Sequence, residues 1–183
     1  MSQEEKNKDP MDFKELLAES DGVTSFVWDD EELLAEEEVT RAVVSFRLGD
    51  DRFSVAGELV REILGEQEVT FLPGAPGHIR GITILRRQVV ALLSLREFLN
   101  LPGEENLAGM RTIIVETPHF MVGLLVDEVT GLGDWPESAI DPDQLPDNLR
   151  ASTARYARGA HFFASSLHIF LDLHTLLEDA ALQ

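Results

Sequence analysis

The residues able to do acid–base or metal chemistry are scattered along this chain of 183 residues. Five histidines stand at positions 78, 119, 161, 168 and 174, and none has the HExxH spacing of a zinc site. His161 precedes two aromatic residues and His168 alternates with Phe170, a pattern typical of structural histidines in strands. The sequence therefore predicts no metal site and no cofactor.

Two other groupings must be weighed as catalysts. Ser165 or Ser166 could act as a nucleophile with His161 or His168 as its base, but the chain has no GxSxG elbow, Walker loop or GxGxxG. Glu62 and Glu128 could form a carboxylate pair, but their pairing in space rests only on the internal repeat, and a symmetric structural role explains them better. We therefore expect a protein that is not an enzyme, with a hydrolase as a remote alternative.

The adjacent cations Arg86 and Arg87 are the strongest functional signal. They separate two apolar runs within residues 77–96, a pattern that predicts a β-hairpin with a cationic tip. Guanidinium groups beside exposed apolar side chains such as Ile84 can pair with carboxylates on a partner, and arginine is enriched at binding hot spots. A charged tip also improves solubility, so a purely structural role stays open.

Alternating strands precede this hairpin and a short helix follows it. Residues 42–48 and 52–55 predict a hairpin around a Gly-Asp turn. The next segment should run extended, with Val60, Glu62 and Leu64 on one face. After the arginine hairpin, the Ser-x-x-Glu sequence at 94–97 has the form of a capping box and predicts a short helix.

The second half of the chain echoes the first. Residues 111–115 begin as 41–44 do, 126–129 resemble 60–63, and 171–177 resemble 93–99 in the same order. The sequence therefore predicts two similar β units, at about 41–100 and 110–183, each closed by a capped helix.

Composition limits the class of protein. Cysteine is absent, 44% of the residues are hydrophobic, and the formal net charge is −19. A body of this size can bury a core without disulfides, and its acidity argues against nucleic acid or an anionic membrane as a partner. No apolar run is long enough to span a membrane. We expect a soluble cytoplasmic protein without direct membrane insertion.

Residues 1–40 differ from the rest, with 14 acidic residues against three lysines. Short apolar islands stand in this acidic segment, each too short to order without a partner. We expect a flexible, solvated N-terminal extension. The alternative is a docking segment anchored by Phe26, Trp28, Leu33 and Leu34.

The order of these motifs resembles the CheW family of chemotaxis coupling proteins. The matching segments are 42–48, 60–63, 79–82, 85–86, the Leu-x-Leu-Arg ending at 96, 122–129 and the final strand into 172–173. The chain departs from the family at Arg87, Ala91 and Ser94, where Gly, Pro and Asp are usual. Serine caps a helix about as well as aspartate, whereas an arginine resists the positive φ that glycine accepts at the tip.

The resemblance implies a mainly β fold of two packed five-stranded, SH3-like β-barrel subdomains with short capping helices. It implies a non-enzymatic adaptor that couples chemoreceptors, through their cytoplasmic tips, to a CheA-type histidine kinase. It places Val60, Glu62 and Arg86 on or near the partner-binding surface, to which we add Ile84 and Arg87. The alternative is a small β-barrel that binds oligonucleotides or a small ligand, which would require a basic, aromatic-lined face.

The contrast between the two segments gives a first prediction. Deleting residues 1–38 should leave the remaining domain folded, because the extension carries too few apolar residues to add to its core. Circular dichroism melting of the full and shortened chains tests this. A large drop in melting temperature would show instead that Trp28 and its neighbours pack on the domain.

Overall fold

Two five-stranded β-sheets form the domain. In a computed structural model of the chain, the residues described are 38–103, 106–118, 120–163 and 165–182, so the suggested docking residues Phe26, Trp28, Leu33 and Leu34 lie outside them. No helix among the described residues is long and apolar enough to cross a membrane. The first half of the chain supplies strands β1 (Thr40–Leu48), β2 (Asp51–Ala56), β3 (Val60–Leu64), β4 (Ile79–Leu85) and β5 (Gln88–Ser94).

The second half supplies the other five strands and the longest described helix. The strands are β6 (Arg111–Glu116), β7 (Met121–Val126), β8 (Glu128–Pro136), β9 (Ala157–Phe163) and β10 (Ser166–Leu171). The α-helices are α2 (Leu95–Phe98), α3 (Ala151–Ala154) and α4 (Leu173–Leu182), and short 3-10 turns lie at η2 (Gly57–Leu59), η3 (Glu137–Ala139) and η4 (Pro142–Gln144).

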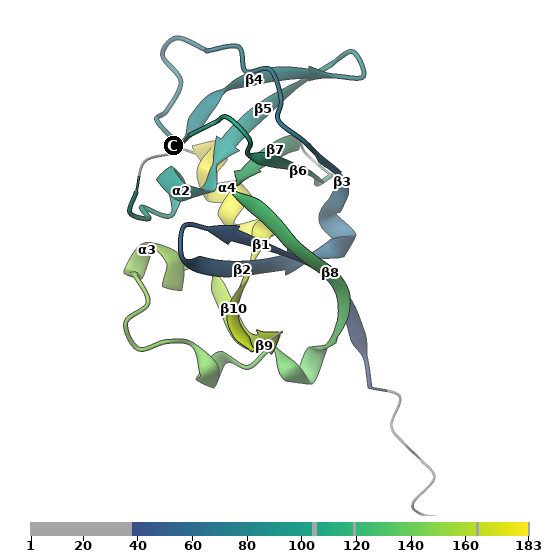
Figure 1. Cartoon of the computed structure of the whole chain (residues 1–183). Helices are drawn as coiled ribbons and strands as arrows, with labels where there is room; N and C mark the ends of the chain where they lie inside the picture. The colour runs from purple at the N-terminus through teal and green to yellow at the C-terminus, as the bar shows by residue number, and fades with distance from the viewer. Residues whose placement is uncertain (1–37, 104–105, 119, 164, 183) are drawn as a thin grey trace, which may run out of the picture. The chain divides into compact units, whose positions relative to one another are not determined.

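The strand orders show how the two halves combine. Sheet A has the order β8-β1-β2-β10-β9 and sheet B the order β3-β6-β7-β5-β4 (Figure 1). Among the described residues no ladder joins the first strand of either sheet to its last, so both sheets are open. A mainly β fold with short helices is therefore confirmed, whereas closure into barrels stays a prediction.

The internal repeat appears as an interlocked topology. Each half contributes a hairpin to one sheet and three strands to the other, and the hairpin lies between strands of the opposite half. Each hairpin joins one neighbour by a parallel pair, β2–β10 or β5–β7, and the other by an antiparallel pair, β1–β8 or β3–β6. The expected subdomains at about 41–100 and 110–183 do not coincide with the sheets, because each sheet takes strands from both segments.

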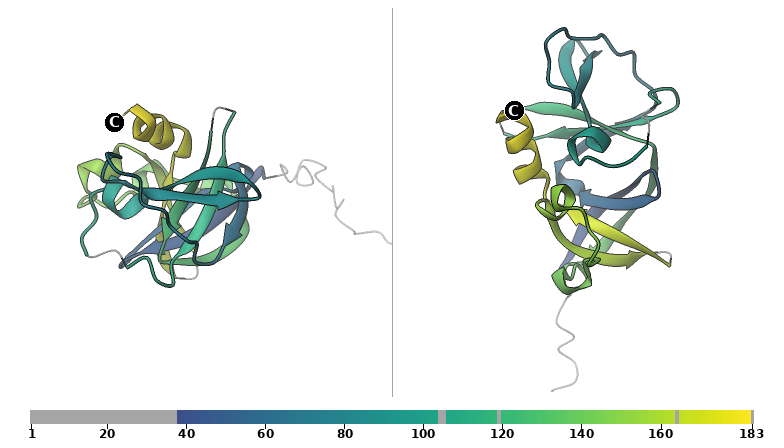
Figure 2. Two further views of the ribbon diagram at one scale, coloured as in Figure 1. Left: turned by 90° about the horizontal axis from the view of Figure 1, so that it is seen from above. Right: turned by 90° about the vertical axis from the view of Figure 1, so that its left-hand side faces the viewer.

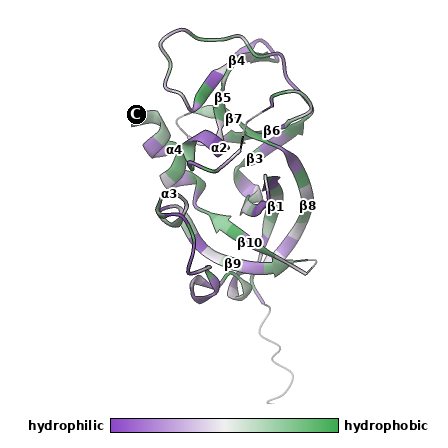
Figure 3. Ribbon diagram, turned by 60° about the vertical axis from the view of Figure 1, so that its left-hand side comes forward, coloured by the Kyte–Doolittle hydropathy of each residue, from purple (hydrophilic) through white to green (hydrophobic). Residues whose placement is uncertain are grey.

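The main core lies between the sheets. Phe46, Phe53 and Leu171 from sheet A and Ile113 and Leu124 from sheet B belong to one buried cluster. In Figure 3 hydrophobic residues colour much of β10, one of the strands that line it. Helix α4 adds three leucines to the same cluster and lies along one side of the sheets in both views of Figure 2.

A side chain caps the N-terminus of the helix that follows each set of three strands, α2 after β3–β5 and α4 after β8–β10. Ser94 accepts a hydrogen bond from the Glu97 N–H, as the capping box predicts. At the equivalent point before α4, Asp172 accepts from the His174 and Thr175 N–H groups. Burial alone would raise the pKa of Asp172, but hydrogen bonds from Thr175 and Arg158 lower it below its usual value.

Arg96 joins four segments at the junction between the sheets. Its side chain is only 8% exposed, and Nη2 lies 2.7 Å from Asp127 Oδ2, in the crossing from β7 to β8. Nη1 donates to the Pro102 carbonyl at 2.7 Å, while the same Asp127 oxygen accepts from the Gly49 N–H at 2.6 Å. A Cβ at Gly49, where φ is +63°, would stand 3.3 Å from Arg96 Nη1. This node therefore fixes the β1–β2 turn against the end of sheet B.

Removing Arg96 should be much more costly than removing an exposed arginine. Arg96→Met leaves Asp127 without its main counter-ion, and we expect a loss of about 3–5 kcal/mol in the free energy of unfolding. The matched control is Arg155→Met, because Arg155 is 64% exposed and pairs with Asp179, so its loss should be about 1 kcal/mol or less. Urea unfolding at pH 7 measures both, and equal losses would contradict a structural role for the node.

Candidate partner-binding surface

Glu62 and Arg86 meet although they come from opposite edges of sheet B. Glu62 lies on β3, the first strand of the sheet, and Arg86 lies in the turn between β5 and the last strand, β4. Arg86 Nη2 is 3.0 Å from Glu62 Oε2, with side-chain exposures of 70% and 18%. The sheet therefore curls until a single ion pair bridges its two edges.

A shift in register turns Glu62 away from Val60. Val60 pairs with Val115 and Glu62 with Ile114, so the strand gains a residue at Arg61, as in a β-bulge. Paired residues share a face, which puts Val60 on the side of the main core and Glu62 on the opposite side. The prediction that Val60, Glu62 and Leu64 share one face is therefore wrong, because simple alternation cannot anticipate a bulge.

The hairpin tip is a two-residue turn built from two arginines. Leu85 pairs with Gln88, and φ is +48° at Arg86 and +71° at Arg87. Positive φ at both central residues is the geometry of a type I′ turn, which favours Asn and Gly. Arg87 thus adopts the positive φ that we expected an arginine to resist. Among the described residues Arg87 makes no hydrogen bond or ion pair, so its charge is available to a partner.

One face of the β4–β5 hairpin, next to the arginine tip, is apolar. Ile84 and Val89 lie directly across from each other and are 74% and 66% exposed. Further along this face, Ala91 and Met121 help to line a groove of about 220 Å³ against the end of α4. The predicted residues therefore form two surfaces, an ionic one with Glu62 and Arg86 and an apolar one with Ile84.

Val60 lines a third feature, which the sequence did not reveal. A groove of about 380 Å³ runs between η2, β1 and β8, with Val60 and Leu132 among its lining residues. Leu132 is 68% exposed, although it lies in a strand. A single leucine between Gly131 and Gly133 is the signal that could have identified it. We name Val60, Leu132, Ala42 and Val44 the Val60 groove.

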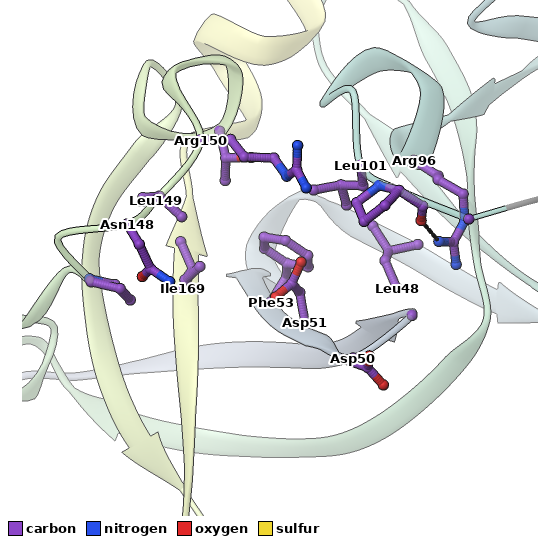
Figure 4. Close-up of a pocket in the computed structure, with 15 residues that line it drawn as sticks. Leu48, Asp50, Asp51, Phe53, Arg96, Leu101, Asn148, Leu149, Arg150 and Ile169 are labelled. Carbon is purple, nitrogen blue, oxygen red and sulfur yellow. Dashed lines mark hydrogen bonds between the residues drawn. The ribbon is translucent and has the colours of Figure 1, made fainter.

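A separate pocket of about 660 Å³ lies beside the Arg96 node (Figure 4). Arg96 and Leu48 stand at one end of this view, and Asn148 and Leu149 at the other. Its lining mixes the acids Asp50 and Asp51 with arginines and buried apolar residues. None of the predicted binding residues lines it, so it is not part of the candidate surface.

The two glutamates weighed as a carboxylate pair each have an arginine partner, in different sheets. Glu62 lies in sheet B and pairs with Arg86, whereas Glu128 lies in sheet A, where Arg47 Nε is 3.2 Å from Glu128 Oε2. They occupy equivalent places in the repeat and are not a carboxylate pair. The described residues contain no group of three or more potential ligands placed to hold a metal ion.

Comparison with known proteins identifies the family of this fold. A family model described as the CheW-like domain matches residues 42–181, and the chain belongs to this family. It is 27% identical over 139 residues to the probable chemotaxis protein CheW of Rhizobium etli, covering 76% of this chain and 88% of that protein. It is 33% identical over 123 residues to protein FrzA of Myxococcus xanthus, covering 67% and 76%.

A solved structure supports the same fold. The scaffolding protein TtCheW from Thermoanaerobacter tengcongensis superposes with a TM-score of 0.67, covering 76% of this chain and 94% of that one at 24% identity. The acidic N-terminal segment precedes the residues that the family model matches.

The turn geometry predicts that glycine is preferred at position 87. Arg87→Gly removes the steric cost of a left-handed residue, about 1 kcal/mol, and should raise the melting temperature by roughly 2–4 °C. Arg87→Ala is the matched control, because it removes the same charge but keeps the Cβ atom. Differential scanning calorimetry compares the two, and a glycine variant no more stable than the alanine variant would contradict this reading of the turn.

Proposed function

We propose that this protein is a non-enzymatic adaptor in chemotaxis-type signal transduction, which couples a chemoreceptor to a CheA-type histidine kinase in the cytoplasm. The observation that carries the proposal is the CheW-like domain over residues 42–181. The names of the relatives agree with it: one is a probable chemotaxis protein and another of known structure is a scaffolding protein.

An adaptor needs at least two binding surfaces that can be occupied together. Arg86 and Arg87 project at the hairpin tip, where Arg86 is 70% exposed even while it contacts Glu62. The Val60 groove lies at the other edge of sheet B, on the opposite side of β3 from Glu62. We assign carboxylate-bearing partner residues to the tip and apolar partner residues to the groove, since each would meet chemistry that complements it.

Glu62 fits a supporting role at the tip. Its Oε2 atom accepts from Arg86, while its Oε1 atom is buried and has no hydrogen-bond partner among the described residues. A partner donor reaching this oxygen would satisfy a group that is costly to leave unpaired. The pair thus holds the guanidinium in place and offers one acceptor.

Charge reversal at the tip tests the proposal. Arg86→Glu should weaken binding to a CheA-type kinase by about tenfold or more, because like charges placed at an interface cost several kcal/mol. Co-elution on gel filtration and isothermal titration calorimetry measure the loss. Arg158→Glu is the matched control, since Arg158 is 66% exposed and also pairs with a largely buried carboxylate, Asp172.

A double variant separates direct contact from internal support. Glu62→Arg combined with Arg86→Glu restores an ion pair inside the protein but leaves the exposed charge reversed. We expect binding to stay weak, because Arg86 itself contacts the partner. Recovery of binding would show that the pair acts only by closing the sheet. Parental binding by all the folded variants would remove the tip from the interface.

A further inference from the structure

The two edges of sheet A are joined by a cluster of rings instead of an ion pair. Trp135 lies on β8, the first strand of the sheet, and His161 and Phe163 lie on β9, the last. The ring centroids of Trp135 and His161 are 4.1 Å apart, and those of Trp135 and Phe163 are 5.7 Å apart. A Cβ at Gly131 would stand 3.4 Å from the Phe163 ring, so this glycine lets the ring approach β8.

His168 contacts both Trp135 and Phe163, the rings that join β8 to β9. Its ring stands edge-on to Trp135, at 5.8 Å and 88°, and to Phe163, at 5.9 Å and 81°. In the β9–β10 ladder His168 lies directly opposite His161. The residue is only 2% exposed, so the imidazole is an interior part of the closure.

The surroundings of His168 suit the neutral ring. The ring makes one hydrogen bond with the backbone of Phe53, while Nδ1 is buried and has no hydrogen-bond partner among the described residues. The hydroxyl of Ser54, on the same face of the sheet, is also buried without a partner. A proton on Nδ1 would therefore add a buried charge that has no hydrogen-bond acceptor in the described part of the chain.

The charged groups facing His168 add to this cost. His161 on β9 and Arg52 on β2 share its face, and both disfavour a second positive charge. Arg41 and Arg47 on β1 share the face too, but Arg41 is paired with Glu58 and Glu137, and Arg47 is paired with Glu128 and Asp127. Beside β9, the Asp141 carboxylate already accepts from the Asp143 N–H and the Gln144 amide.

We propose that this ring cluster is an acid-sensitive latch. Protonation of His168 breaks the ring contacts between β9 and β8 and separates the two edges of sheet A, while the Glu62–Arg86 pair holds the edges of sheet B together. Leu132 lies on β8, so the opening also deforms the Val60 groove. The proposal concerns the domain by itself and does not depend on the adaptor function.

The direction of the effect follows from proton linkage. Burial, Arg52 and His161 lower the pKa of His168 below 6.5, although its bond with the Phe53 backbone opposes them. The open form therefore binds more protons than the closed form as the pH falls through 6.5. The contribution of His168 to closure is therefore fully present above that pH and falls as the pH drops below it, with the opening equilibrium changing by up to about tenfold per pH unit.

Hydrogen exchange of the full chain between pH 7.5 and 5.5 tests the latch. After correction for intrinsic rates, amides of β9 and β10 should lose protection by up to about tenfold per pH unit below 6.5. Amides of β6 and β7 in sheet B should keep theirs. Simultaneous loss in both sheets, or no loss in β9, would overturn the proposal.

Three variants assign the effect to His168. His168→Leu should abolish the acid-dependent loss, because leucine fills the site without a titratable group. Should that variant fold poorly, Arg52→Gln provides a surface substitution that moves the transition to lower pH by removing a facing charge. His174→Gln, at an exposed histidine of α4, is the control and should leave the transition unchanged. A transition unmoved by Arg52→Gln, or abolished by His174→Gln, would contradict the latch.

Discussion

The ion pair between the buried Arg96 and the partly buried Asp127 is the constraint on which the arrangement of the domain depends. Arg96 lies in α2, directly after β5 of sheet B, and Asp127 stands where the chain crosses from sheet B to sheet A. Their contact, together with the Gly49 amide, ties the end of the β5–β7 ladder of sheet B to the β1–β2 turn of sheet A. Charges removed from water contribute little net stability, but they leave few alternative geometries. The node therefore specifies how the two sheets meet, while the large apolar core supplies the energy.

Each sheet curls until side chains close what its backbone leaves open. Sheet B uses an ion pair at its surface, which salt screens. Sheet A uses tilted and edge-on rings packed around the buried His168, which salt barely affects and which disfavour a charged imidazole. Two sheets with equivalent strand orders thus join their edges by different chemistry.

Much of the fold could be predicted from the sequence because it depends on local pattern. Strand alternation and the cap at Ser94 depend on residues close together in the chain, and the order of the echoes is found by comparing short segments of this kind. The exchange of hairpins between the halves could not be predicted, since the same strands satisfy either pairing. The same limit applies to the candidate surface. Arg86 could be identified from the sequence as a charge in an apolar run. The face of Glu62 depends on a bulge, and the groove beside Leu132 is formed with residues 70 or more positions away, so neither could be predicted.

The interlocked strand order has a consequence for how the chain can be divided. Cutting within the connector between α2 and β6 would yield two fragments with five strands each, yet neither would contain a whole sheet. Each fragment would expose the edges on which the missing hairpin belongs. Such fragments are suited to reconstitution from separate chains. In the intact polypeptide, distant strands must come together before either sheet is complete, which favours slow, concerted folding.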